Sequence, residues 1–516
     1  MYKTSRNVLD ARQPVELVLE LKSFAGGENT IGEDQELKLN EARKIENWDA
    51  IALGGMKRSK GFNLVADGGA TWSEDIDLVI QHKEGASTRV YAVVEGDLVY
   101  EDGVALTLDD NGAFSTGILC HGVSVGGVLY ITNSTDNIKY KTLAGDVTAL
   151  TNVPDDPRER IHYHKFRLIA EGGGRRVYGS RAGTGNFNAS DGFSLTNDAW
   201  NIDLPEDTKG GVSIGDDFYV FTEFEAYALY NMPDIAYRQI IGSHGCSAPY
   251  SIVKAKEGIF LVSRYPTLGV YLWVGSSWEN LTKNHNFVEK INFGQRIFGT
   301  YRNDKYYLFY NETGSGVNYP NKLKIFDVKF GRWMDRPVNT AIGDNFGYPC
   351  LLTHANNELY VGSSLTDKLY ELETADDSDE GENTEADYTT KDFSSADFSV
   401  NTGGQFPIDE VRMKIIKLVL TAYGTKGTIT IQWSADRGQI TGSQSFDVSA
   451  SGDLLNTTFI LNSSYLSATP PAKTIAKSVA NSAVGRRFKF QIINANTGER
   501  PEIKKLKIHA IAAEEL

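Results

Sequence analysis

The stretch IFLVSRYPTLGVYLWV at residues 259–274 decides the fold class of this chain. It joins two short hydrophobic runs, IFLVS and GVYLWV, through the turn-like segment RYPTL. Two runs rich in β-branched and aromatic residues, separated by a few turn residues, predict paired antiparallel strands, because such side chains pack well on a pleated surface. This stretch is therefore predicted to be a β-hairpin.

The same pattern recurs along the first 372 residues. Hydrophobic runs begin at residues 90, 128, 166, 218, 259, 306 and 359, with spacings of 38, 38, 52, 41, 47 and 53 residues. A period of about 45 residues matches the repeat of a four-stranded propeller blade, ~40 to 50 residues. The sequence predicts an all-β chain that begins with a β-propeller of six or seven blades. The irregular spacing leaves a long β-solenoid and several stacked sandwiches open as alternatives. Each run is followed by a second one that carries an aromatic residue, at Tyr100, Tyr140, Tyr178, Tyr230, Tyr271, Phe326 and Tyr370.

The hairpin pattern stops near residue 372, where an acidic segment begins. ETADDSDEGENTEAD, residues 373–387, has 8 acidic residues among 15 and no aromatic residue, which is the composition of a solvated linker. A calcium loop is the alternative, but the segment lacks the ordered Asp-x-Asp-x-Asp-Gly spacing. The predicted organisation is a propeller with an N-terminal arm at 1–372, an acidic linker at 373–387 and a C-terminal domain at 388–516.

The last part of the chain holds six further strand-like segments. Separated by polar turns, they predict a β-sandwich or jelly-roll-like domain. Lys and Arg alternate with apolar residues at 487–490 and 505–508, so one face of these strands is expected to be packed and the other wet and basic. The segments are 414–423, 428–434, 443–449, 457–461, 486–494 and 503–512.

Charge and cysteine content exclude several classes of protein. The net charge is -15, and residues 388–516 hold 15 Lys and Arg against 11 Asp and Glu, so this part is near +4 and residues 1–387 are near -19. Such a chain is not expected to act mainly on nucleic acid or an anionic membrane, which needs clustered Lys and Arg. Cys120, Cys246 and Cys350 fit neither a disulfide framework nor zinc spacing, so reduced thiols are expected.

The sequence is also not expected to carry a secretion signal or a membrane anchor. Residues 1–14 contain no apolar h-region, and no stretch approaches the roughly 20 apolar residues of a membrane span.

Two segments contain histidine in patterns that can indicate chemistry. His162 and His164 share one face of a predicted strand, but two imidazoles make only half a zinc site, so a polar strand face is the simpler interpretation. GSHGC at 242–246 contains Ser, His and Cys, yet near neighbours in sequence rarely reach the geometry that a nucleophile and its base require. It is interpreted as a turn before a strand at 250–253.

Three Gly-containing segments are also interpreted as turns. EGGGR at 171–175 lies between two strands and not before a helix, so a hairpin loop is favoured over a phosphate cradle. ADGGATW at 66–72 and SADRG at 434–438 approximate the Asp-box turn of sialidases. In those enzymes this box resembles a structural hairpin turn and not a catalytic element. The sequence therefore predicts no catalytic, cofactor-binding or metal-binding residue, no cofactor, and a protein that is not an enzyme.

Three segments resemble a family of phage proteins. FAGGENTIGEDQELKLNEARKIENWDAIALGGMKRSKGF at 24–62 resembles the F-x-GG-x-N, D-x-E, N and R-x-x-G succession near the start of β-propeller virion proteins of short-tailed phages. That family includes head-to-tail connector, packaged-DNA stabilisation and tail hub proteins. Residues 241–263 followed by GVYLW, and residues 414–438, are similar to it as well.

The resemblance implies a structural virion protein, folded in the host cytoplasm and then built into the tail. It implies a homo-hexameric ring around the DNA channel, with portal, adaptor, nozzle or needle, and fibre proteins as partners. Packaged DNA would pass without specific binding, because an acidic propeller repels phosphate, while the basic face of the last domain could dock an acidic neighbour.

Two other functions are compatible with the same sequence. A carbohydrate-binding or carbohydrate-cleaving propeller, such as a receptor-binding tail protein, is the first alternative, because aromatic residues are abundant enough to stack on sugars. A cellular protein-interaction propeller is the second, since a fold does not fix a function.

Overall fold

The structure is a computed structural model that contains almost only strands. It describes residues 16–33, 36–51, 54–69, 71–72, 74–103, 105–151, 153–154, 158–183, 192–193, 199–230, 237–337, 346–352, 357–374, 379, 384–400, 411–423, 427–436, 438, 440–449, 472–479, 484–496 and 499–512. Two compact units result: unit 1 comprises residues 1–60, 332–335 and 383–516, and unit 2 comprises residues 61–331 and 336–382. Across the described residues, no helix is long and apolar enough to cross a membrane.

The stretch that decided the fold class forms the predicted hairpin. β23 (Ile259–Ser263) pairs antiparallel with β24 (Gly269–Trp273), with Ile259 opposite Trp273, and all ten residues are buried. The other six predicted hairpins are confirmed in the same way. Their strand pairs are β7 (Ser87–Val94) with β8 (Asp97–Glu101), β11 (Val128–Asn133) with β12 (Lys139–Lys141), β15 (Arg167–Glu171) with β16 (Arg176–Gly179), β19 (Asp217–Phe221) with β20 (Ala226–Tyr230), β27 (Lys305–Tyr310) with β28 (Lys322–Asp327), and β31 (Glu358–Ser363) with β32 (Leu369–Leu372).

Each hairpin supplies the two middle strands of a sheet. Unit 2 has six four-stranded antiparallel sheets, and the meander β26–β27–β28 takes a seventh position between two of them. The inner strands are β6 (Ile76–Glu84), β10 (Cys120–Val125), β14 (Arg160–His164), β18 (Gly210–Ile214), β22 (Val253–Lys254), β26 (Phe298–Arg302) and β30 (Phe346–Leu352). The outer strands are β9 (Leu106–Asp110), β13 (Thr148–Ala149), β17 (Trp200–Asp203), β21 (Tyr237–Gly242), β25 (Trp278–Asn280) and β5 (Phe62–Ala66).

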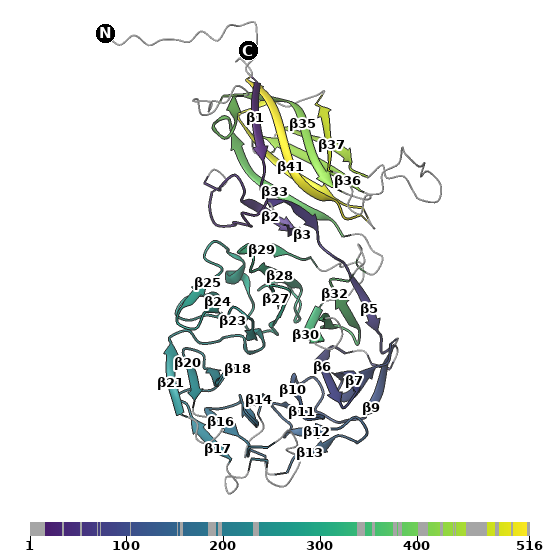
Figure 1. The fold of residues 1–516 in the computed structure, drawn as a ribbon, viewed down its shortest axis with the longest axis vertical. Coiled ribbons are helices and arrows are strands. Elements are labelled where there is room, and N and C mark those ends of the chain that lie inside the picture. Colours follow the sequence, from purple (N-terminus) through teal and green to yellow (C-terminus); the bar gives the residue numbers. More distant parts are fainter. Residues whose placement is uncertain are drawn as a thin grey trace, which may run out of the picture. The chain divides into compact units, whose positions relative to one another are not determined.

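The sheets close into a ring, so unit 2 is a β-propeller (Figure 1). Each inner strand contacts the next in chain order, and β30 contacts β6 again. β5 completes the sheet of β30, β31 and β32, with Phe62 opposite Leu372, so the two ends of unit 2 are paired in one sheet. A closed ring excludes the solenoid and the stacked sandwiches as descriptions of unit 2, because both leave their first and last sheets apart.

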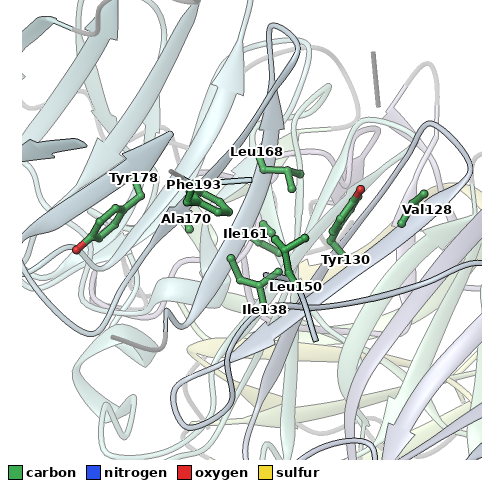
Figure 2. Packing of buried hydrophobic residues seen from close by; sticks show 9 residues of the cluster. All are labelled: Val128, Tyr130, Ile138, Leu150, Ile161, Leu168, Ala170, Tyr178 and Phe193. Carbon is green, nitrogen blue, oxygen red and sulfur yellow. The ribbon is translucent and has the colours of Figure 1, made fainter. Parts of the chain in front are cut away.

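The core of the propeller lies between neighbouring sheets. Figure 2 shows one such cluster, in which Tyr130 of β11 packs near Ile161 of β14 and Leu168 of β15. Ile161 and Leu168 are fully buried. Burying a side chain of this size contributes about 1.5–3 kcal/mol, so clusters repeated around the ring hold the sheets together.

Unit 1 contains two sheets. In the first, β1 (Glu16–Leu21) and β35 (Met413–Tyr423) pair with opposite edges of β41 (Glu502–Ala512), and β3 (Trp48–Ala50), β4 (Met56–Arg58), β34 (Ser399–Val400), β38 (Lys473–Ser478) and β39 (Val484–Gly485) complete it. The second has the order β29 (Arg332–Asp335), β2 (Ala42–Glu46), β33 (Ala386–Ser394), β40 (Arg487–Asn494), β36 (Thr428–Ala435) and β37 (Ile440–Asp447). Residues alternate between buried and half-buried along β40. The expected C-terminal β-sandwich or jelly-roll arrangement stays a prediction, and its segment at 457–461 lies outside the described residues.

The division into units differs from the expected domain boundaries. Residues 1–60, expected as an arm of the propeller, belong to unit 1, because β1 buries Leu17, Leu19 and Leu21 while pairing with β41 at the other end of the chain. Pairing between strands nearly 500 residues apart is not encoded by any local pattern.

The expectation of a solvated linker at 373–387 is wrong for the residues that the structure describes there. Thr374, Asp379, Thr384 and Asp387 are buried, and β33 already begins at Ala386. Asp379 forms an ion pair with Arg336. The acidic composition therefore partly reflects buried, paired carboxylates and not only a wet surface.

Candidate functional site

The inner strands of the propeller surround an axial cavity of about 140 Å³. Its lining combines imidazole, guanidinium and aromatic side chains with two glycines. A cavity of this size is close to the roughly 150 Å³ that holds one benzene molecule. The lining residues are His121, Arg160, His162, Gly211, Pro249, Tyr250, Ile252, Phe298, Gly299, Tyr348 and Pro349.

Glycines on two inner strands allow the close approach of neighbouring groups. A Cβ at Gly299 would lie 2.8 Å from the carbonyl oxygen of Ser251, and one at Gly211 would lie 2.5 Å from the ring of Phe218. A larger residue at 299 would collide with the Ser251 backbone, and one at 211 with a side chain of its own sheet.

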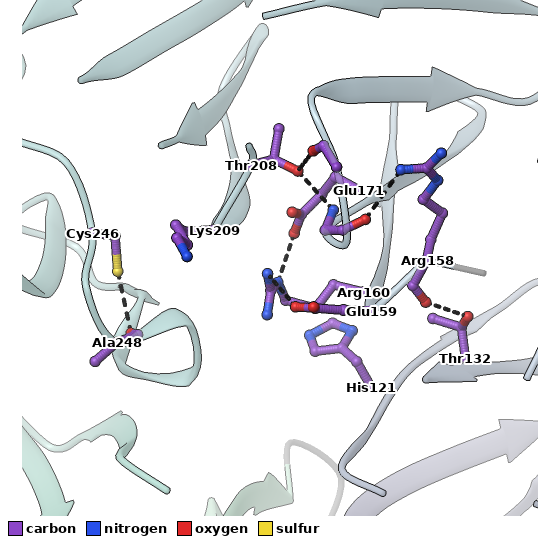
Figure 3. A network of polar contacts seen from close by, with 12 residues as sticks. His121, Thr132, Arg158, Glu159, Arg160, Glu171, Thr208, Lys209, Cys246 and Ala248 are labelled. Carbon is purple, nitrogen blue, oxygen red and sulfur yellow. Dashed lines mark hydrogen bonds and ion pairs between the residues drawn. The ribbon is translucent and has the colours of Figure 1, made fainter. Parts of the chain in front are cut away.

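A buried ion pair supports one wall of the cavity (Figure 3). Arg160 Nε donates to Glu171 Oε1 at 2.9 Å, and His162 Nε2 lies 3.1 Å from the same oxygen. The Arg160 and Glu171 side chains are 3% and 0% exposed. Burial by itself would raise the pKa of Glu171, but Arg160 and His162 outweigh it and lower the pKa to about 2. Glu171 is therefore an ionised structural partner and not a proton donor at neutral pH.

The two predicted histidines lie on one strand face, as expected. The rings of His162 and His164 both contact Phe218, with centroid distances of 5.3 and 6.0 Å. His164 Nδ1 lies 2.6 Å from Ser213 Oγ, while His162 faces Glu171. No group of three metal-ligating side chains occurs among the described residues.

The third imidazole of this region belongs to His121. Its ring centroid lies 4.9 Å from that of His162. Burial, with His162 and Arg160 adding to it, holds the pKa of His121 well below its ordinary value. The axial cavity consequently contains a neutral imidazole at physiological pH.

The GSHGC segment begins with the last residue of β21 and continues as a loop, so the predicted turn is confirmed as a connection between strands. His244 stacks on Trp278 with a centroid distance of 5.2 Å and an interplanar angle of 21°, and Cys246 Sγ donates to the Ala248 carbonyl at 3.2 Å. The strand expected at 250–253 is wrong at its start: a 3₁₀ turn, η2 (Pro249–Ser251), precedes β22. Pro249 has no N–H group for a strand ladder, which explains the turn.

The thiols are not activated nucleophiles. Burial raises the pKa of Cys120, Cys246 and Cys350 to about 12 in each case. All three cysteines are free. At neutral pH they remain protonated, which suits packing and not catalysis.

The remaining Gly-containing segments also occupy turns. EGGGR connects β15 to β16, as predicted. In the first Asp-box-like segment, Asp67 Oδ1 accepts the Gly69 N–H at 2.8 Å, and Trp72 Nε1 donates to Asp97 at 3.0 Å. In the second, Asp436 has a φ of 47° between β36 and β37, which is turn geometry.

One polar contact across the ring was not predictable from sequence. Arg296, just before β26, forms ion pairs with Asp75 and with Asp77 Oδ1 at 2.8 Å, just before and within β6. Its Nη2 also donates to the Gly117 carbonyl near the start of β10, at 3.4 Å. Since β30 lies between β26 and β6 in the ring, this side chain links blades that are not neighbours. No motif marks such an arginine.

No family model and no curated protein matches this chain. Among solved structures it is similar to the computationally designed Ika8 protein, at 9% identity and a TM-score of 0.39 over 60% of this chain and 99% of that one. It is similar to YCF48 bound to a D1 peptide, at 8% identity and a TM-score of 0.41 over 63% and 98%. The extracellular domain of the BT4673 one-component system from B. thetaiotaomicron has 11% identity and a TM-score of 0.41 over 60% of this chain, which spans only 40% of that structure. Similarities at these values carry no argument about what this chain does.

Proposed function

We propose that this protein is a structural component of a phage tail or head-to-tail connector, and not an enzyme. In this role it would form a homo-hexameric ring around the DNA channel, stabilise packaged DNA and attach distal tail parts. The observation that supports the proposal most directly is where the residues of the sequence resemblance lie. Residues 24–60 and 414–438 belong to unit 1 and residues 241–263 and 269–273 to unit 2, and the buried residues of the opening segment carry the argument.

The opening segment illustrates this placement. Phe24 is fully buried and meets the ring of Tyr388 edge-on at 5.3 Å. A Cβ at Gly26 would lie 2.4 Å from the Asn40 carbonyl oxygen, so only glycine fits there. Asn29 Oδ1 accepts the Gly32 N–H at 3.2 Å. These residues specify a fold, which is what members of a structural family would share.

A buried arginine at the end of the same segment joins distant parts of unit 1. Arg58 is 2% exposed and donates to the Thr384 carbonyl at 2.5 Å, to Asn494 Oδ1 at 3.0 Å and to the Glu499 carbonyl at 3.0 Å. Its planar guanidinium presents five donors in a rigid fork, which the compact ammonium of a lysine does not reproduce. The opening segment and the C-terminal strands thus depend on each other.

The charges of the two units suit passage of DNA without specific binding. Unit 1 holds 26 Lys and Arg and 24 Asp and Glu, a net charge of +2, whereas unit 2 holds 26 and 43, a net charge of -17. An acidic propeller repels phosphate. The predicted basic face at 505–508 is partly balanced within the chain, because Lys505 and Lys507 both form ion pairs with Glu20 of β1. Docking of an acidic neighbour there would compete with Glu20.

Light scattering of the purified protein tests this proposal, alone and mixed with portal, adaptor and needle proteins from the same genome. The expected result is a ring-sized complex with the portal or the adaptor. A protein that stays monomeric and ignores all of these partners would overturn it. Arg58→Lys serves as a control variant, because it should weaken assembly only as far as it unfolds unit 1.

A receptor-binding role in which glycans stack on aromatic side chains is the second candidate, and one observation favours it. Phe224 and Tyr265 are 43% and 40% exposed, and their ring centroids are only 4.6 Å apart. They come from the β19–β20 and β23–β24 turns of adjacent blades. A glycan array tests this role, with Leu365→Ala, another exposed turn residue, as the control. Binding that is lost in Tyr265→Ala but kept in Leu365→Ala would favour the role. An array without any signal would rule it out.

A further inference from the structure

A second pocket of the propeller, with a volume of about 430 Å³, lies at the turn between β15 and β16. This volume is within the range of ~300–1,000 Å³ that is typical of small-ligand sites. Three arginines and two aspartates dominate its lining. The lining residues are Arg158, Gly173, Gly174, Arg175, Arg176, Tyr178, Asp203 and Asp207.

The turn is held rigidly from both sides (Figure 3). The buried Thr208 donates its N–H to the Gly174 carbonyl at 2.9 Å and accepts the Gly172 N–H at 2.7 Å. On the other side, Arg158 Nη1 donates to the Gly172 carbonyl at 3.2 Å. The turn requires glycine at 172, where φ is 89° and a Cβ would lie 2.7 Å from Glu159 Cβ. Such bracing preorganises the pocket and lowers the entropy cost of binding.

The arginines differ in how far the chain already uses them. Arg176 is paired in a fork with Asp203, at 2.6 and 3.1 Å. Arg158 is buried and donates to Gly172 and Tyr178. Arg175 is exposed, and its Nε donates to the Leu204 carbonyl at 3.0 Å. Neither of its terminal nitrogens donates to an acceptor among the described residues.

Backbone groups add to this surplus of donors. The N–H groups of Gly173 and Gly174 make no hydrogen bond with the part of the chain that the structure describes. Successive N–H groups of a tight turn form concavities that bind anions. The pocket therefore carries a net charge of +1 within a unit of net charge -17, and two of its lining residues have backbone N–H groups that no described group uses.

We propose that this pocket binds a small oxyanion, a phosphate, sulfate or carboxylate group, on Arg175 and the Gly173–Gly174 turn. The guanidinium fork matches such groups in geometry and charge. Asp203 is already neutralised by Arg176, so it does not oppose the anion. Asp207 is exposed and without an ion pair in the described residues, and it limits the affinity.

Titration calorimetry of the full chain tests the proposal, with inorganic phosphate, sulfate and acetate as probes at constant ionic strength. We expect saturable binding of at least one probe, about tenfold or more weaker in Arg175→Gln, because a charge-assisted hydrogen bond is lost. Asp207→Asn should bind about threefold or more tightly, since a like charge is removed. Binding of phosphate and sulfate but not acetate would identify a tetrahedral group, and binding of acetate as well would extend the class to carboxylates.

Arg264→Gln is the matched control, because Arg264 is also exposed in a blade turn but stacks on Phe293 at 5.3 Å, away from the pocket. It should leave binding unchanged. The proposal is overturned if no probe binds, if Arg175→Gln binds like the unaltered protein, or if Arg264→Gln weakens binding equally. Thermal unfolding of each variant checks that the fold is kept. The outcome is independent of whether the protein assembles with virion proteins.

Discussion

Replacing Glu171 by Gln tests how the propeller keeps its axial wall in place. The substitution preserves size and leaves an amide oxygen for Arg160, but it removes the charge that compensates a guanidinium that is 3% exposed. Removing one partner of a buried ion pair typically costs about 3–5 kcal/mol, because the other charge stays buried without compensation.

The same magnitude follows from the pKa of Glu171. That pKa falls from an ordinary 4.5 to about 2 in the folded protein. A shift of this size corresponds to about 3 kcal/mol of folding free energy. Because the folded pKa is depressed, this contribution is fully present above pH 4.5 and is lost as the pH falls toward 2. The stability gap between the two proteins should be constant from pH 7 to 5 and about 1.4 kcal/mol smaller near pH 3.5.

Hydrogen exchange read out by peptide mass is the appropriate assay, since a chain with two units need not unfold in one step. Peptides from β14 and β15 should exchange about a hundredfold faster in Glu171→Gln at pH 7. The double variant Arg160→Met with Glu171→Leu should be less destabilised than Glu171→Gln, because no uncompensated charge remains. A change below about 1 kcal/mol at pH 7 would refute the view that this pair is buried and mutually dependent.

Three further outcomes are expected. Burial outweighs the opposing effect of Glu84 and lowers the pKa of His82 to about 4, so folding stability that is present above pH 6.5 is lost as the pH falls from 6.5 to 4. His82→Gln should reduce this loss by up to about 3 kcal/mol, measured by urea titrations at pH 7.5 and 4.5. An equal loss of stability in the variant would contradict the prediction. Gly245→Ala should lower the free energy of unfolding by more than about 2 kcal/mol in thermal unfolding, since a Cβ there would lie 2.2 Å from the Glu223 backbone. Gly275→Ala, in open space at φ 69°, should lower it by only about 1 kcal/mol. Equal losses in the two variants would argue against the close approach at Gly245. Arg58→Lys should destabilise unit 1 by about 2–4 kcal/mol, because several buried acceptors lose their donor. Hydrogen exchange should become faster in β4 and β40 and stay unchanged in β14. Equally faster exchange across both units would show that the effect is not local.

The hairpins could be predicted because their information is local. A run such as IFLVS, a short turn and GVYLWV fix two strands and their pairing within 16 residues, and a recurrence of about 45 residues extends this to a propeller. The turn character of 242–246 and 171–175 followed from the same local reasoning. The chemistry of these turns did not, because it depends on which distant groups they meet.

Sequence alone therefore determined the all-β class, the seven hairpins and the separate charge of the C-terminal part. Only the tertiary structure decided that β1 pairs with β41, that Asp379 is buried against Arg336, and that Arg175 lies in a pocket with Asp203 and Asp207. Strand formation and hairpin pairing are set by neighbours along the chain, whereas the pairing of chain ends, the burial of a charge and the shape of a pocket depend on contacts between segments that sequence separation does not reveal.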